Sequence, residues 1–144
     1  MLLGTPTMNN LVLDTHVFIW YLTGDTTLPV KSRQLINQHL TKANVYISAI
    51  SCWEMAMLEQ KKRIVLTEPC LQWIHEGLQG SGIQVLELTP QICVESCALP
   101  GNLHGDPADR MIIASARTTH SQLLTRDQSI IAYGKKNHVQ VVEV

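Results

Sequence analysis

The sequence predicts one α/β domain whose sheet is mainly parallel and covered by helices on both faces. Its 144 residues suffice for one compact domain and are too few for two of ordinary size. Hydrophobic residues make up 45% of the chain and charged residues 16%, so a core can form and disorder is not expected. Short apolar runs alternate with longer amphipathic segments along the chain, and this alternation is typical of parallel sheets.

The strands are predicted from five short apolar or β-branched runs, at residues 11–13, 45–47, 83–88, 123–124 and 140–143. The first run ends at Asp14 and contains no polar residue, as expected of a strand buried on both faces.

The segments between these strands are predicted to be helices. In chain order they span residues 16–23, 30–40, a stretch from Ser48 or Ser51 to about 61, 68–80, 90–98 and 107–120. Gly24 should end the first helix, and Pro69 and Pro107 fall in the first turn of two others. Residues 99–105 contain a proline and two glycines, so they form a loop.

The remaining composition excludes several classes of protein. No apolar run is long enough to span a membrane, and residues 1–10 lack the features of a signal peptide. We expect a short tail over residues 1–9, with a possible start at Met8, and one domain over residues 10–144 of a cytoplasmic protein. The four cysteines form no Cys-x-x-Cys pair or zinc motif and are expected to be reduced and mostly buried.

The formal net charge is −1, so the field of the whole molecule does not attract nucleic acid. Positive charge for such a substrate would have to come from a local patch or a bound metal. The densest basic run, Lys61-Lys62-Arg63, could meet a phosphate backbone or could be a solvated helix end.

Two aspartates directly follow predicted strands. Asp14 comes after residues 11–13, and Asp127 lies shortly after residues 123–124. In parallel sheets, ligands bind at the carboxyl ends of the strands, so both are candidate site residues. Each could instead be a helix cap or a turn residue.

Two other acids lie on apolar stripes of predicted helices. Glu54 shares a stripe with Ile50, Met57 and Leu58, and Asp109 precedes Ile112 and Ile113 by three and four residues. A carboxylate in such a stripe is costly to bury unless it is paired or binds a metal. The alternatives are that Glu54 reaches water at the edge of the stripe and that Asp106 and Asp109 serve the start of a helix.

Together these acids indicate a divalent-metal site. Four carboxylates in one cleft raise each other's pKa and cannot all be ionised without a cation. Their hard oxygen ligands suit Mg²⁺ or Mn²⁺, and such a metal can activate water to cut a phosphodiester.

The motifs that carry these acids also resemble a known family, the PIN-domain nucleases, and most closely its VapC-type toxins of bacterial toxin–antitoxin pairs. The resemblance spans nearly the whole chain from about Asn10 and rests on four stretches: Leu13-Asp14-Thr15-His16, Ser48-Ala49-Ile50-Ser51-Cys52-Trp53-Glu54, His104-Gly105-Asp106-Pro107-Ala108-Asp109-Arg110 and Leu124-Thr125-Arg126-Asp127. Ala108 stands where this subgroup typically has an aromatic residue.

The resemblance implies a three-layer α/β/α sandwich and a Mg²⁺- or Mn²⁺-dependent endoribonuclease that cuts RNA. It also implies a homodimer that a small antitoxin neutralises. Matched residue by residue, the family's acids correspond to Asp14, Glu54, Asp109 and the more variable Asp127, with Asp14, Glu54 and Asp109 as metal ligands.

Several neighbours of these acids have weaker roles with open alternatives. Thr15 could hydrogen-bond a metal ligand, and Asp106 could supply a further acid or only cap a helix. His104 and Arg126 could contact phosphate or neither, and Arg110 could pair with Asp106 or hold phosphate. The tryptophans are expected to be core or interface anchors.

Two other functions compete with RNA hydrolysis. A phosphatase with Asp14 as nucleophile usually needs a second Asp two residues later, where this chain has His16. A non-catalytic module that keeps the fold is the other alternative, and the intact set of acids argues against it.

Overall fold

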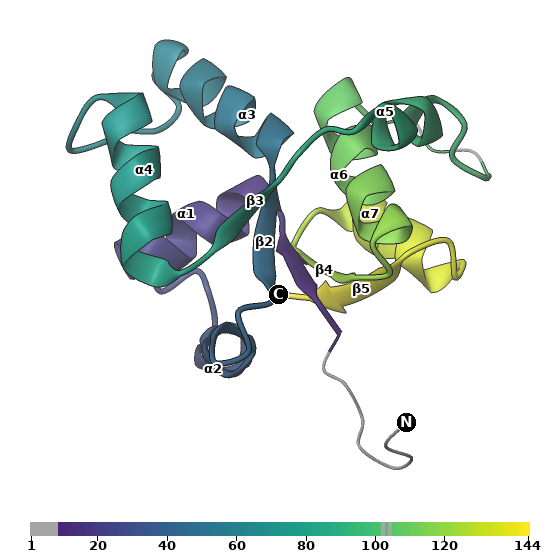
Figure 1. The fold of residues 1–144 in the computed structure, drawn as a ribbon, viewed down its shortest axis with the longest axis horizontal. Helices are drawn as coiled ribbons and strands as arrows, with labels where there is room; N and C mark the ends of the chain where they lie inside the picture. Colours follow the sequence, from purple (N-terminus) through teal and green to yellow (C-terminus); the bar gives the residue numbers. More distant parts are fainter. Residues whose placement is uncertain (1–8, 102, 104) are drawn as a thin grey trace.

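The computed structural model describes residues 9–101, 103 and 105–144, which form a five-stranded sheet with helices on both sides (Figure 1). All paired strands are parallel, in the order β3-β2-β1-β4-β5. The strands are β1 (Leu11–Leu13), β2 (Val45–Ser48), β3 (Gln84–Leu86), β4 (Gln122–Thr125) and β5 (Gln140–Glu143). The predicted α/β class and parallel sheet are confirmed.

The helices form the two outer layers of this sandwich. On one side of the sheet lie α1 (Thr15–Thr23), α2 (Val30–Leu40), α3 (Ala49–Gln60) and α4 (Cys70–Ser81). On the other side lie α5 (Pro90–Cys97), α6 (Pro107–Thr118) and α7 (Gln128–Lys135) (Figure 1). Gly24 ends α1 as predicted, with a left-handed φ of 70° and its N–H donated to the carbonyl of Trp20.

The central strand β1 contributes to both hydrophobic cores. Leu11 and Leu13 pack into the core shared with α1 to α4, and Val12 packs into the core shared with α5 to α7. Successive side chains of a strand point to opposite faces, so a strand between two helical layers must be apolar at every position. The uninterrupted apolar run before Asp14 therefore reflects its place in the middle of the sheet.

Two elements are shorter than predicted. Strand β3 covers Gln84–Leu86 rather than 83–88, because it lies at the edge of the sheet and pairs only with β2. Helix α4 begins at Cys70 rather than at 68, because Pro69 has an extended backbone (ψ 140°) and occupies the N-cap position.

The expected burial of the cysteines is wrong. Cys52, Cys70 and Cys93 are half-buried, and Cys97 is exposed; none forms a disulfide. In α5 the buried positions are Ile92 and Ser96, which turns the two cysteines that follow them toward the edge of the packed face.

No helix in the described part of the chain has both the length and the apolar character that crossing a membrane requires.

Candidate active site

The carboxyl ends of β1, β2 and β4 lie at one edge of the sheet, because β1 pairs with both of the other strands in parallel. Asp14 follows β1, and α3 with Glu54 begins directly after β2. Helix α6 packs against α3 and β1, so its first turn reaches the same edge (Figure 1). The topology therefore collects the acids of four distant segments.

Asp14 is held by hydrogen bonds to both of its carboxylate oxygens. Oδ1 accepts from the backbone N–H of Thr15 at 2.8 Å, and Oδ2 accepts from the hydroxyl of Thr125 at 2.6 Å. Burial raises the pKa of Asp14, while these two hydrogen bonds oppose the rise. Asp14 thus occupies the N-cap position of α1 and also lies at the site edge.

Glu54 lies beside the buried face of α3 rather than within it. The buried positions of this helix are Ser51, Met55 and Leu58, so the predicted stripe is displaced by about one residue and Glu54 lies at its half-buried edge. The hydroxyl of Thr15 donates to Glu54 Oε1 at 2.5 Å, and Thr15 Oγ1 lies 2.8 Å from Ser51 Oγ. Burial raises the pKa of Glu54, and the nearby carboxylates of Asp14 and Asp106 raise it further.

Two acids with different roles lie at the start of α6. Asp106 is the N-cap, and its Oδ1 accepts from the backbone N–H of Asp109 at 2.8 Å. Burial and the repulsion of the other acids, led by Asp106 and Asp14, raise the pKa of Asp109 from 3.8 to about 7. A negative charge on Asp109 is therefore disfavoured unless a cation lies nearby.

Three of these acids are close enough to share one cation. One carboxylate oxygen from each of Glu54, Asp106 and Asp109 lies within 4.8 Å of the other two. Ligand oxygens around a Mg²⁺ ion at roughly 2 Å are separated by roughly 3–4 Å, so small side-chain adjustments suffice. This trio differs from the predicted ligands by having Asp106 in place of Asp14, and it shows that Asp106 both caps its helix and joins the acidic group.

Asp127 lies at the border of the site. Its Oδ1 accepts from the N–H of Ile130 at 3.0 Å and so caps α7, while its own N–H donates to Thr125 Oγ1 at 3.0 Å. Its charge still raises the pKa of Asp14 and Asp109. The structure therefore keeps Asp127 near the trio without including it.

The candidate arginines bind backbone carbonyls. Arg110 donates to the carbonyls of Ser96 (2.9 Å) and Leu103 (2.8 Å) and so ties α6 to α5 and to the preceding loop. Arg126 donates to the carbonyls of Thr27 (3.0 Å) and Val144 (3.1 Å). Neither arginine forms an ion pair with an acid of the site within the described residues.

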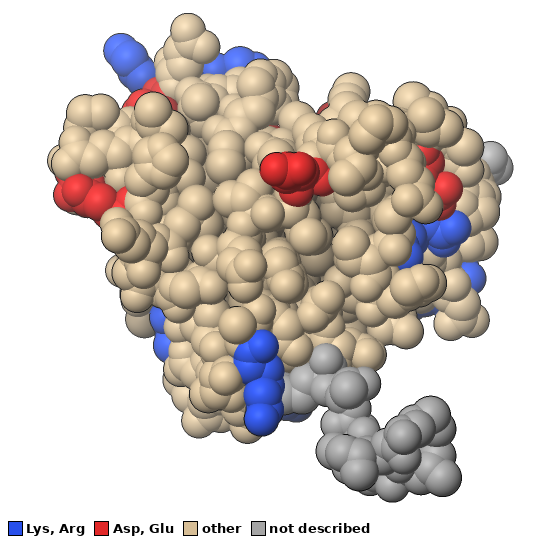
Figure 2. All heavy atoms as spheres, in the orientation of Figure 1, with Lys and Arg blue, Asp and Glu red and all other residues tan. Residues whose placement is uncertain are grey.

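Two further predicted contacts with phosphate stay predictions. His104 lies outside the described residues. Lys61, Lys62 and Arg63 are exposed directly after α3, and they lie at the opposite end of that helix from its capped start. Figure 2 shows one face of the molecule, on which acidic and basic side chains form small separate groups rather than a continuous basic surface.

The residues that orient the acids were missed from the sequence, apart from Thr15. Thr125 bridges Asp14 and the backbone of Asp127, and Ser51 contacts Thr15. The sequence pointed to His16 only as the position where a phosphatase would need a second Asp. In the structure, His16 lowers the pKa of both Asp14 and Glu54. A polar residue at the end of a strand, two positions before an acid, is the signal that could have indicated Thr125.

Comparison with known proteins agrees with the family resemblance of the sequence motifs. The family model described as PIN domain matches residues 11–136. The chain is 31% identical over 134 residues to Ribonuclease VapC22 of Mycobacterium tuberculosis, a match that covers 93% of this chain and 99% of the relative.

Two solved structures share the fold at lower identity. The DNA-bound VapBC of Salmonella typhimurium has a TM-score of 0.68 at 18% identity, covering 94% of this chain and 98% of its own. VapBC-5 of Mycobacterium tuberculosis, a member of the VapBC family of toxin-antitoxin systems, has a TM-score of 0.59 at 18% identity, covering 95% and 100%.

Proposed function

The chain belongs to the PIN-domain family, and from this premise we propose that it is a metal-dependent endoribonuclease, the toxin of a type II toxin–antitoxin pair. The observation that carries the proposal is the group formed by Glu54, Asp106 and Asp109, which come from two helices and leave their negative charges without a cationic partner among the described residues. RNA as the substrate is supported by the relative named Ribonuclease VapC22.

The donor set favours a hard divalent cation. All three members of the trio offer carboxylate oxygens, which suit Mg²⁺ or Mn²⁺ better than softer metals. Burial and mutual repulsion raise the pKa of Asp109 to about 7, and a bound cation would remove that repulsion. We propose Mg²⁺ or Mn²⁺ as the cofactor on these grounds.

The roles of the residues follow from their contacts. Glu54, Asp106 and Asp109 would hold the cation together with Asp14, which the sequence predicts as a ligand, and Asp127 would add negative charge beside them. When bound, the cation supplies positive charge for the phosphate and lowers the pKa of the attacking water. Thr15 fixes the direction of Glu54, and Thr125 fixes the direction of Asp14.

We also propose a homodimer and a small antitoxin protein as partners. The structural neighbours are VapBC assemblies, which supports a protein partner. Exposed apolar side chains on three helices, namely Trp53, Leu71 and Val94, offer surface that such contacts would bury.

The decisive experiment is metal-dependent cleavage of total RNA with the fragment ends sequenced. Wild-type protein should cut in Mg²⁺ or Mn²⁺ and stop in EDTA, and Asp109→Asn should lose cleavage while keeping its circular dichroism spectrum. Asp25→Asn, the same change in an exposed loop acid, is the matched control and should cut normally.

Two results would contradict this proposal. Cleavage by pure protein that persists in EDTA would exclude the metal-dependent mechanism. Absence of Mn²⁺ binding in calorimetry at millimolar metal would favour a non-catalytic module.

A further inference from the structure

An exposed histidine that the proposed mechanism does not use lies at the border of the acidic site. His16 is the second residue of α1 and follows Asp14 by two positions. The pKa of Asp14 and the pKa of Glu54, each raised mainly by burial, are both lowered in part by His16. Because Asp14 caps the helix two residues before His16 and the adjacent Thr15 donates to Glu54, the imidazole lies near carboxylates that come from two separate parts of the chain.

The ring of His16 is supported from its own helix. His16 and Trp20 are four residues apart on α1, which places them on one side of the helix. Their ring centroids are 5.9 Å apart at an interplanar angle of 46°. Trp20 packs against the hydrophobic core, so the histidine ring has a fixed apolar support.

A guanidinium group holds Trp20 in turn. The Cζ atom of Arg126 lies 5.5 Å from the centre of the Trp20 ring. Arg126 is itself anchored by its hydrogen bonds to the carbonyls of Thr27 and Val144. Trp20 thus contacts both His16 and Arg126, and we call these three planar side chains the aromatic row.

The two outer members of the aromatic row lie close to acids along the chain. His16 follows Asp14, and Arg126 directly precedes Asp127. Bases of single-stranded RNA stack on the faces of aromatic rings and of arginine. Of the three members, His16 and Arg126 are exposed, and His16 directly follows Thr15, whose hydroxyl donates to Glu54.

We propose that the imidazole ring of His16, backed by Trp20, stacks on an unpaired RNA base next to the phosphate that is cut. This inference rests on the proposed function and adds to it a residue that positions the substrate. The role of His16 is to position the nucleotide, so a different aromatic ring can replace it. Stacking also explains why an aromatic ring stands exposed beside a site built from carboxylates.

The test is equilibrium binding of fluorescent oligonucleotides of roughly ten nucleotides, a length that spans such a site. The probes are oligoadenylate, oligouridylate and an oligomer of the same length without bases. All proteins carry Asp109→Asn to prevent cleavage. His16→Ala should weaken binding of oligoadenylate about fivefold to a hundredfold, which is the effect of losing one base–aromatic stack. It should leave binding of the oligomer without bases unchanged.

Further variants separate stacking from other roles. His16→Phe should restore the affinity for oligoadenylate, whereas His16→Gln, which keeps a hydrogen-bond donor without a ring, should behave like His16→Ala. His75→Ala is the matched control, because His75 is also exposed on a helix, and α4 contributes no acid to the site.

Each contrary result has a distinct meaning. Equal losses for oligoadenylate and for the oligomer without bases would overturn the stacking role, and so would rescue by Gln but not by Phe. If the Asp109→Asn parent binds oligoadenylate but His16→Ala changes nothing, only this inference fails. If the protein with Asp109 intact neither binds Mn²⁺ nor cuts RNA, the proposed function fails with it.

Discussion

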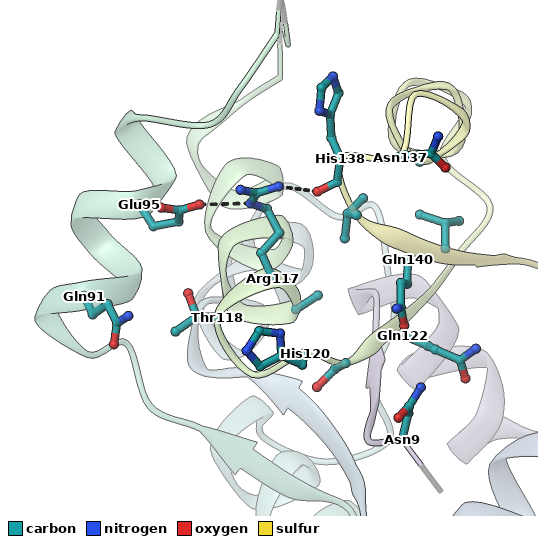
Figure 3. Close-up of a pocket in the computed structure, with 15 residues that line it drawn as sticks. Asn9, Gln91, Glu95, Arg117, Thr118, His120, Gln122, Asn137, His138 and Gln140 are labelled. Atoms are coloured by element: carbon teal, nitrogen blue, oxygen red, sulfur yellow. Dashed lines mark hydrogen bonds and ion pairs between the residues drawn. The ribbon is translucent and has the colours of Figure 1, made fainter. Parts of the chain in front are cut away.

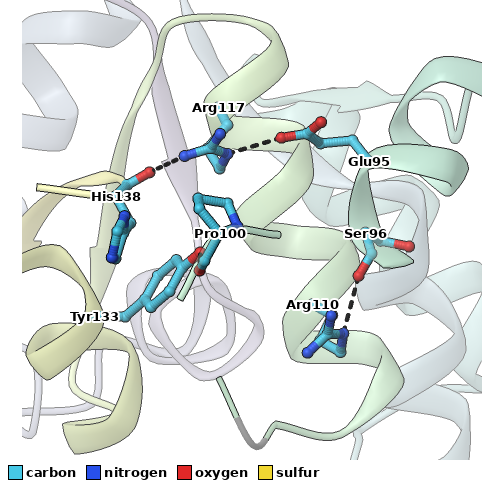
Figure 4. Close-up of polar contacts among 7 residues, drawn as sticks. All are labelled: Glu95, Ser96, Pro100, Arg110, Arg117, Tyr133 and His138. Carbon is cyan, nitrogen blue, oxygen red and sulfur yellow. Dashed lines mark hydrogen bonds and ion pairs between the residues drawn. The ribbon is translucent and has the colours of Figure 1, made fainter. Parts of the chain in front are cut away.

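Polar groups lie at both ends of the parallel strands. Opposite charges pair at the amino end, whereas negative charges gather at the carboxyl end. At the amino end, a hollow of about 1010 Å³ is lined by polar residues from α5, α6 and β5 (Figure 3). There Arg117 pairs with Glu95 at 2.9 Å and also donates to the carbonyl of His138 (Figure 4). At the carboxyl end, Glu54, Asp106 and Asp109 share one sign and have no paired cation among the described residues.

This difference indicates which end carries chemistry. Paired charges with satisfied hydrogen bonds stabilise a structure and need no ligand. Like charges held close together destabilise a structure, and a bound ligand of opposite charge relieves the repulsion. We therefore assign a structural role to the hollow at the amino end and place the proposed chemistry at the acidic edge.

The largest expected effect comes from Glu54→Gln, which removes one charge of the trio and keeps the shape of the side chain. Cleavage in Mg²⁺ should fall about a thousandfold, because a lost ligand removes several kcal/mol of charge stabilisation in the transition state. Single-turnover rates at saturating RNA measure this loss. Glu95→Gln makes the same change at the amino end and should stay within about twofold of wild type. Equal losses in both variants would abolish the distinction between the two ends.

A smaller effect is expected from Thr125→Val, which keeps the volume of a buried residue and removes its hydroxyl. Asp14 Oδ2 and the N–H of Asp127 would both lose a hydrogen-bond partner. The free energy of unfolding should therefore fall by about 2 kcal/mol, and cleavage should slow. Urea denaturation and cleavage rates test this. Thr125→Ser retains the hydroxyl and should recover most of both. A stable and fully active Val variant would show that Asp14 needs no such support.

At the amino end, Arg117→Met should lower the stability of the fold without changing the cleavage rate. The partly exposed ion pair with Glu95 contributes little, and the hydrogen bond to the carbonyl of His138 contributes more. We expect a loss of about 1–2 kcal/mol in urea denaturation with an unchanged cleavage rate below the melting temperature. Loss of cleavage in the folded variant would place a function at this end.

The smallest effect is the pH dependence of the metal-free protein. Folding raises the pKa of Asp109 from 3.8 to about 7, so its contribution to stability is fully present below pH 4 and is lost as the pH rises through 7. Water in the open site screens the repulsion, and we expect a loss of only about 1 kcal/mol. Melting temperatures in EDTA between pH 4 and pH 8 measure it.

Asp109→Asn is the matching variant for this pH dependence. It should flatten the decline and be more stable than wild type at pH 8. A wild-type protein whose stability rises with pH over this range would contradict the repulsion at the acidic edge.

Much of the fold followed from local patterns. The run before Asp14 had to be a buried strand, since no other element is apolar at each successive position and ends so soon. The helix starts at Asp106 and Thr89 were readable because their side chains cap the backbone only a few residues away. Burial was harder to infer, and the cysteines show why: a shift of one residue around a helix moves a side chain from the core to the edge.

The sequence by itself determined which acids could form a site, because each follows a strand or lies in the first two turns of a helix that a parallel sheet directs to one edge. Only the tertiary structure decided their partners. Thr125 reaches Asp14 across 111 positions of the chain, and Asp106 rather than Asp14 joins Glu54 and Asp109. The reason is that caps and strand ends are local, whereas the distance between carboxylates on α3 and α6 depends on how those helices pack.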